Sequence, residues 1–247
     1  DITNKKDRAI TMMMVPFMSC SARLPVYMLF IGAFFAEQKA LVMLSLYIIG
    51  ILLSICFAWV MQHMPAFRQP KHDYVSELPP YRRPTLRNTG LHIWERVADY
   101  LQKIPAVIIW ASVIIWALTY FPTGDMNHME ESYLASIGHW IEPVMRPLGF
   151  DWKMSVCLLT GLPAKEAIVS TMGILYPADT ALSAFTPVTA FAFMVFVLLY
   201  FPCVATITTL RREIGAKWAW FSVGQSLILA WVLSFVIYQV GQLVVGV

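Results

Sequence analysis

Apolar runs separated by short charged stretches dominate the chain. A bilayer core of about 30 Å requires roughly 20 apolar residues in each helix that crosses it. Four runs approach or exceed that length: residues 40–61, 104–121, 187–210 and 218–240. The composition, 58% hydrophobic and 13% charged, is that of an integral membrane protein. We therefore predict an all-α, polytopic helical bundle.

Two apolar regions contain a proline close to a cysteine. In the run 9–35, residues 16–25 read PFMSCSARLP, and in the run 187–210, residues 202–206 read PCVAT. Proline removes a helical hydrogen bond and frees carbonyls, which is tolerated in a membrane only where the backbone is buried in protein or lines a cavity. We predict a broken helix at each segment. Two independent proline kinks are the alternative.

Loop charges predict the orientation, although the net charge is only +3. Residues 64–103 contain seven Lys and Arg against four acidic residues, so the positive-inside rule places them in the cytoplasm. The charged residues of the segment 122–153 are mostly acidic, so this segment belongs outside. The run 154–175, interrupted by GLPAKE at 161–166, must then begin and end outside. We predict a re-entrant hairpin there, with its tip at 163–166.

On this topology, the spans with the two Pro-and-Cys breaks cross the membrane in opposite directions. That is the relation expected of inverted repeats whose broken helices meet near the midplane. We divide the chain into a first gate part with its following helix, a cytoplasmic loop with an amphipathic helix, and a second gate part. Their bounds are 1–63, 64–103 and 104–247.

The cytoplasmic loop predicts its own structure. Prolines keep residues 77–84 extended, and Thr85 can cap the helix that follows. Apolar residues share one stripe of that helix: Leu86, Ile93, Trp94, Val97 and Leu101. We predict an interfacial amphipathic helix, with Pro105 at a kink or in the first turn of the next span. A membrane anchor without any partner fits the same pattern.

Cys20 and Cys203 are the strongest candidates for metal contact, since thiolate sulfur suits softer transition metals and the freed carbonyls add oxygen ligands. Met18, Ser19, Ser21 and Thr206 are near enough in sequence to contribute. Burial for packing is the alternative for any small apolar cysteine. We assign that role to Cys56 and Cys157, which have no adjacent break.

Charged residues inside apolar runs need compensation. Glu166 lies at the predicted hairpin tip and is a candidate ligand or proton relay. Its neighbour Lys165 can hold it ionised or stabilise the broken backbone, and a purely structural pair is the alternative. Arg23 can cap the carbonyls at the Cys20 break.

Several functions have no sequence signature here. No phosphate-binding GxxxxGK[ST] motif occurs, no basic and aromatic patch indicates nucleic acid, and the histidines lack metal-site spacing. We predict neither an enzyme nor a bound cofactor in this chain. The four separated cysteines predict no disulfide framework. The chain begins at Asp1 and reaches an apolar run within about ten residues, so we expect the later part of a longer protein.

The motifs are similar to those of the bacterial ferrous iron transporter family FeoB, in the second half of its membrane domain. They follow the family's order over nearly the whole chain: 7–11 (DRAIT), 16–27, 77–82 (ELPPYR), 94–96 (WER), 161–166, 169–171 (VST), 201–206 and 211–213 (RRE).

The resemblance implies a GTP-regulated permease that imports Fe(II) across the bacterial inner membrane, with Cys20 and Cys203 as gate cysteines. It implies that GTP and Mg bind in a G domain that this chain lacks. A region containing Glu77, Tyr81, Arg82, Trp94 and Glu95 is the candidate relay from that domain.

The implied partners are membrane lipid, the missing amino-terminal G domain and first membrane half, small cytoplasmic accessory proteins, and further copies in a homo-oligomer. Two other functions compete. One is a carrier of nucleosides or other small solutes with the same gate fold, and the other is a membrane scaffold that transports nothing.

Overall fold

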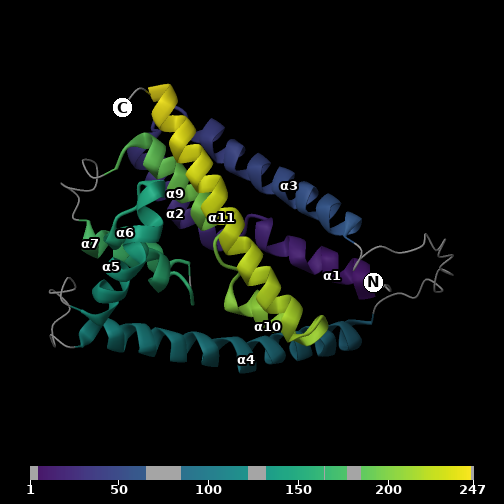
Figure 1. The fold of residues 1–247 in the computed structure, drawn as a ribbon. Coiled ribbons are helices and arrows are strands. Elements are labelled where there is room, and N and C mark those ends of the chain that lie inside the picture. The colour runs from purple at the N-terminus through teal and green to yellow at the C-terminus, as the bar shows by residue number, and fades with distance from the viewer. Residues whose placement is uncertain (1–4, 65–84, 122–131, 164, 177–184, 246–247) are drawn as a thin grey trace.

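The described residues of the computed structural model, 5–64, 85–121, 132–163, 165–176 and 185–245, form helices joined by turns, with no strand among them (Figure 1). Three helical segments of this part are long and apolar enough to cross a membrane: Ala9–Phe34, Lys39–His63 and Ala216–Val244. The all-α fold predicted from the apolar runs is confirmed.

The first predicted break is present. Helix α1 (Lys5–Met14) gives way to two 3-10 turns, η1 (Val15–Phe17) and η2 (Ser21–Arg23), before α2 (Leu24–Phe34) begins. Pro16 and Pro25 each lie in the first turn of the element that contains them, where a missing amide costs little. The next helix, α3 (Lys39–His63), agrees with the predicted span at 40–61.

The second predicted break divides the run 187–210 into two helices. Helix α9 (Pro187–Leu199) ends before Pro202, and α10 (Val204–Glu213) starts after Cys203. Gly215, with φ +96°, then turns the chain into α11 (Ala216–Val245), which packs along α9 (Figure 1). Close contact between these helices requires Gly241, because a Cβ there would lie 2.4 Å from Val188.

The interrupted run 154–175 forms a helical hairpin, with α6 (Trp152–Thr160) packed against α7 (Ala167–Leu175). The hydroxyl of Thr171 donates to that of Thr160 at 2.9 Å and ties the two arms together. The turn between them spans the predicted tip, apart from residue 164, which lies outside the described residues. That this hairpin is re-entrant in a membrane stays a prediction.

Residues 132–148 correct the sequence analysis, which read them as part of a connection. They contain α5 (Tyr133–Met145) and η4 (Arg146–Leu148). The hydroxyl of Ser132 caps α5 by accepting from the amide of Ala135 at 3.2 Å. Helix α5 packs closely on α6 at Gly138, where a Cβ would lie 2.7 Å from Val156.

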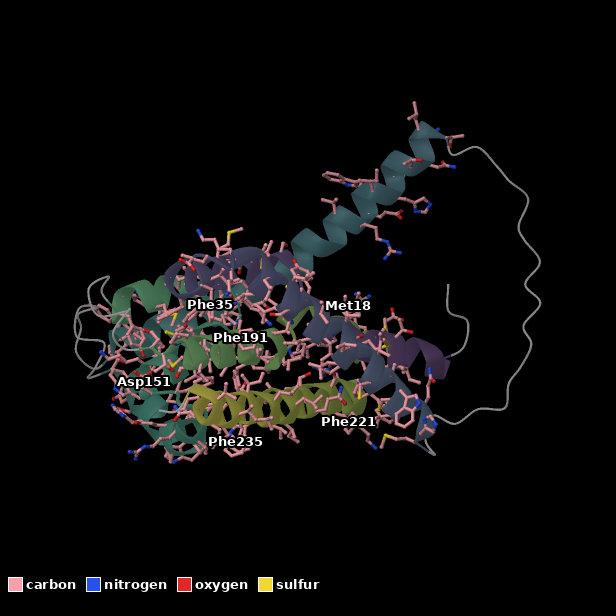
Figure 2. All side chains as sticks on the ribbon, turned by 90° about the horizontal axis from the view of Figure 1, so that it is seen from above. Met18, Phe35, Asp151, Phe191, Phe221 and Phe235 are labelled. Carbon is pink, nitrogen blue, oxygen red and sulfur yellow. The ribbon has the colours of Figure 1, made fainter. Side chains whose placement is uncertain are left out.

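Helix α4 (Leu86–Tyr120) runs without interruption across the boundary that we drew at 103/104. It begins after Thr85 as predicted, but no side-chain hydrogen bond caps it, and Pro105 lies well beyond its first turn. The first half of α4 stands clear of the other helices (Figure 2), and its stripe residues Leu86, Ile93 and Trp94 are exposed. The side chains of 99–108 are outside the described part, so the span expected at 104–121 stays a prediction.

Two apolar clusters hold the bundle together. The main cluster surrounds α9, whose residues 192–199 are all buried, and includes side chains of α2, α6 and α7. A smaller cluster consists of Ala9, Ile10, Met13 and Met61, with Trp218 packed against it. Both clusters include residues of the first broken helix, since Met14 contacts the smaller one and Phe17 belongs to the main one.

Candidate functional site

The first break is held by an arginine from within the break. Arg23 is only 3% exposed, and its two terminal nitrogens donate to the carbonyl of Met18 at 2.8 Å and that of Pro16 at 2.7 Å. In a continuous helix, each of these carbonyls would accept a hydrogen bond from the amide four residues later. The break prevents those bonds. Arg23 therefore caps the carbonyls freed at the Cys20 break.

The residues around Cys20 differ in exposure. Cys20 itself is extended (φ −110°, ψ 162°) and exposed, as are Met18 and Ser21. The hydroxyls of Ser19 and Tyr27 are buried, and neither has a hydrogen-bond partner in the described part of the chain. The thiol is thus accessible beside polar groups that have capacity left for a ligand or water.

The second break presents its cysteine in the same way. Pro202 is buried, and Cys203 is extended (φ −61°, ψ 155°) and exposed immediately before α10. The hydroxyl of Thr206 lies 3.0 Å from the Cys203 sulfur. Thr206 and Cys203, which the sequence placed near each other, are in direct contact.

The hairpin tip reaches the second break. Lys165 is 6% exposed, and its Nζ donates to the carbonyl of Val197 at 3.3 Å. A continuing α9 would bond this carbonyl to the amide of Phe201, but the helix ends at Leu199. Nζ also lies 5.2 Å from the ring centroid of Tyr200, whose hydroxyl donates to the carbonyl of Leu158 at 3.4 Å. Lys165 therefore stabilises broken backbone.

Lys165 and Glu166 do not form an ion pair with each other in the described part of the chain. Glu166 is exposed at the start of α7 and makes no side-chain capping bond there. The pair that we considered, with Lys165 holding Glu166 ionised, is therefore absent from this structure. As a ligand or proton relay, Glu166 stays a prediction.

Groups from both breaks lie within electrostatic range of Lys165. They are Arg23 and Cys20 from the first break and Cys203 from the second. Tyr200 likewise has Arg23 within electrostatic range. The hairpin tip, which is bonded to α9 through Lys165, is thus the element whose charge both thiols share.

The described residues do not include a ready-made metal cage. No group of three or more His, Cys, Asp or Glu side chains in the described ranges is placed to hold an ion. All four cysteines are free. Cys157 is buried in α6, as predicted, whereas Cys56 is exposed on α3, so the burial predicted for it is wrong. The described part offers two exposed soft sulfurs, one of them in contact with the Thr206 hydroxyl, while the freed carbonyls of Pro16, Met18 and Val197 are bonded by Arg23 and Lys165.

Sequence reasoning missed the brace at the base of the hairpin. Asp151 caps α6 by accepting from the amide of Met154 at 2.8 Å, and the hydroxyl of Tyr176 lies 2.6 Å from each of its carboxylate oxygens. Burial and the Asp151 carboxylate raise the pKa of Tyr176, so the phenol remains a donor. The signal was an Asp directly before a helical run, a common N-cap.

The candidate relay region is only partly described. Glu77, Tyr81 and Arg82 lie outside the described residues. Trp94 and Glu95 lie on the exposed first half of α4, where the Glu95 carboxylate is 3.6 Å from Nδ1 of His92.

Two families match the chain. Residues 43–96 match the family described as ferrous iron transport protein B C terminus, and residues 101–217 match the gate family described as nucleoside recognition. No solved structure matches the chain.

Curated relatives match almost all of the chain. The Fe(2+) transporter FeoB of Staphylococcus aureus strain COL is 40% identical over 99% of the chain and 38% of its own length. The Fe(2+) transporter FeoB of Methanocaldococcus jannaschii is 37% identical over 98% of the chain and 38% of its own length. A fusion of Fe(2+) transport protein A with Fe(2+) transporter FeoB from Porphyromonas gingivalis is 39% identical over 97% of the chain and 35% of its own length. The chain thus spans less than two fifths of these relatives.

Proposed function

Since the chain belongs to the FeoB family of Fe(2+) transporters, we propose that it is the permease part of an importer that moves Fe(II) into the cytoplasm. The observation that carries the proposal is that Cys20 and Cys203 are both exposed at helix breaks and both lie within electrostatic range of Lys165. Each thiol is exposed at a point where a helix is broken, and sulfur is a ligand that Fe(II) accepts.

In this proposal Cys20 and Cys203 are the central metal contacts. Met18, Ser19, Ser21 and Thr206 supply secondary oxygen or sulfur contacts, and Glu166 attracts the cation at the hairpin tip. Arg23 and Lys165 hold the backbone of the two breaks and do not ligate.

The whole transporter is larger than this chain. We place it in the bacterial inner membrane as a multi-pass protein, with GTP and Mg bound by a G domain encoded outside residues 1–247. Residues Glu77, Tyr81, Arg82, Trp94 and Glu95 would relay the state of that domain along α4 to the gates. Small accessory proteins and further copies of the transporter are its expected cytoplasmic and membrane partners.

Iron uptake by the full-length transporter tests the thiol assignment. Cys20→Ser and Cys203→Ser should each abolish most uptake of ferrous iron into proteoliposomes while leaving insertion unchanged, because serine keeps the volume but not the soft ligand. Cys56→Ser is the matched control, since Cys56 is equally exposed but lies within the continuous helix α3. Full uptake in both gate variants would refute the assignment.

A nucleoside carrier is the second candidate, favoured by the match of residues 101–217 to the nucleoside recognition family. In that case nucleosides, and not divalent metals, should compete with the transported substrate. A scaffold that transports nothing is the third. It would be favoured if the unmodified full-length protein assembled in proteoliposomes but took up neither iron nor nucleosides. A Glu166→Gln variant that transports normally would instead exclude a role for Glu166 in transport.

A further inference from the structure

Helix α11 carries three buried polar side chains without partners. The hydroxyls of Ser222 and Ser226 and both amide atoms of Gln225 are buried, and none has a hydrogen-bond partner in the described part of the chain. Both serines are 0% exposed. Spacings of three and four residues place all three on one face of α11. We call Ser222, Gln225 and Ser226 the polar layer.

The same helix shows what an ordinary buried serine does. Ser234 is also 0% exposed, but its hydroxyl donates to the carbonyl of Ala192 at 3.1 Å. Buried hydroxyls and amides are almost always bonded, because leaving them unpaired sacrifices their hydration without compensation. Three unpaired groups on one face therefore leave hydrogen-bonding capacity that water or a ligand can fill.

The polar layer separates the two apolar clusters. Four residues before Ser222, on the same face, Trp218 packs against the smaller cluster. Ala230, four residues after Ser226, belongs to the main cluster, and Leu229 packs against that cluster. The polar side chains thus occupy the level at which one apolar cluster ends and the other begins.

Both helix breaks lie near that level. Helices α9 and α11 are antiparallel, with Gly241 beside Val188 and Ser234 bonded to Ala192 (Figure 1). Continuing this register brings Ser226 opposite the end of α9 at Leu199. In the first broken helix, Met14 contacts the smaller cluster and Phe17 the main one, so that chain also breaks between the clusters.

We propose that the polar layer is a hydrated compartment that receives the divalent cation when it leaves the two thiols. Its ligands are neutral oxygens, which bind a cation through its water shell more weakly than thiolate does and so favour release. It lies in the first half of α11, which follows the basic turn Arg211, Arg212 and Lys217, and the positive-inside rule assigns such a turn to the cytoplasm. The identity of the transported cation rests on the proposed function, whereas the hydration of the polar layer does not.

Thiol labelling tests the hydration directly. In the full-length transporter with its native cysteines replaced, Ser226→Cys should react with a charged methanethiosulfonate reagent at least about tenfold faster than Ser234→Cys. Ser234 is the matched control because it has the same helix, residue type and burial but a bonded hydroxyl. Equally slow labelling at both positions would overturn the proposal.

Uptake tests the role in transport. With the native cysteines present, Gln225→Leu combined with Ser222→Ala should lower iron uptake about tenfold, whereas Ser234→Ala should leave it near the unmodified rate. Unchanged uptake in the double variant would remove the layer from the path.

The two proposals fail separately. If Ser226→Cys labels rapidly but Cys20→Ser and Cys203→Ser retain uptake, the thiol assignment is wrong and the hydrated layer stands. If Ser226→Cys is inert and the thiol variants lose uptake, the reverse holds.

Discussion

The two helix breaks present the same physical problem, and the chain solves it in two different ways. At the first break, Arg23 caps two carbonyls that lie five and seven residues away in its own segment. At the second, the carbonyl of Val197 is bonded by Lys165, which is 32 residues away and belongs to the hairpin. The first break is stabilised locally and the second by docking of another element.

Because of this difference, we expect the first break to be the more rigid of the two and the second to depend on the hairpin. A cap supplied by the same segment forms whenever the segment folds, so the backbone around Cys20 keeps its shape independently of other helices. The backbone before Cys203 keeps its capped form only while the hairpin is docked against α9. Movement of the hairpin would therefore alter the second gate first.

Arg23→Met should give the largest loss of stability. It leaves the carbonyls of Pro16 and Met18 without their charged donor, and each buried acceptor left unpaired costs about 1–3 kcal/mol. The midpoint of thermal unfolding in detergent would report it. Arg146→Ala, at an exposed arginine, is the control and should change the midpoint little. Equal midpoints would show that the local cap contributes nothing.

Gly161→Ala should give the next largest loss of stability, and it should perturb only the second break. A Cβ there would lie 2.4 Å from Ile168 and 2.7 Å from the Tyr200 hydroxyl, so the hairpin tip must shift at a cost of about 1–3 kcal/mol. Gly173→Ala, in the middle of α7 with nothing within 4 Å, should instead stabilise the hairpin slightly. Labelling rates at Cys203 should change in the first variant, and those at Cys20 should not.

Lys165→Met should cost less stability than Arg23→Met, about 1 kcal/mol, although both residues are buried to a similar degree. The single hydrogen bond from Lys165 to the backbone is long, at 3.3 Å. Methionine avoids the desolvation cost of a buried ammonium group and fills most of the volume of the lysine side chain. Unfolding midpoints measured side by side would compare the two. A loss equal to that of Arg23→Met would contradict the distinction between local and docked caps.

Thr171→Val should have the smallest effect. It removes the hydrogen bond between the hairpin arms at constant volume, which is worth about 1 kcal/mol. Thr160 keeps a partner, because its hydroxyl donates to the carbonyl of Cys157. Hydrogen exchange of the α7 amides should rise while that of α2 stays constant. Equal exchange in both helices would show that the hairpin is not an independent unit.

The breaks themselves were predictable because proline acts on its own neighbourhood. Pro16, Pro25 and Pro202 each remove a helical hydrogen bond and so favour a break, and the glycine and proline of 161–166 do the same at the hairpin turn. The exposed first half of α4 was visible in its stripe at helical spacing. Its full length was not, because Pro105 suggested an ending that the structure does not have.

Helix α5 and the hairpin brace were not predicted. The acidic residues at 122–153 satisfied the charge pattern of an outer loop, and that pattern hid a helix that packs on α6 through Gly138. Tyr176 and Asp151 are 25 residues apart, so only the closed hairpin brings them together.

The sequence alone determined that this is an all-α membrane protein with broken helices at two cysteines. Those properties depend on local backbone chemistry and on the length of apolar runs, which can be read residue by residue. The tertiary structure decided which group bonds each freed carbonyl, that both thiols lie within electrostatic range of Lys165, and that the polar layer of α11 lies between two apolar clusters. These are contacts across long stretches of chain, and they exist only once the helices have packed.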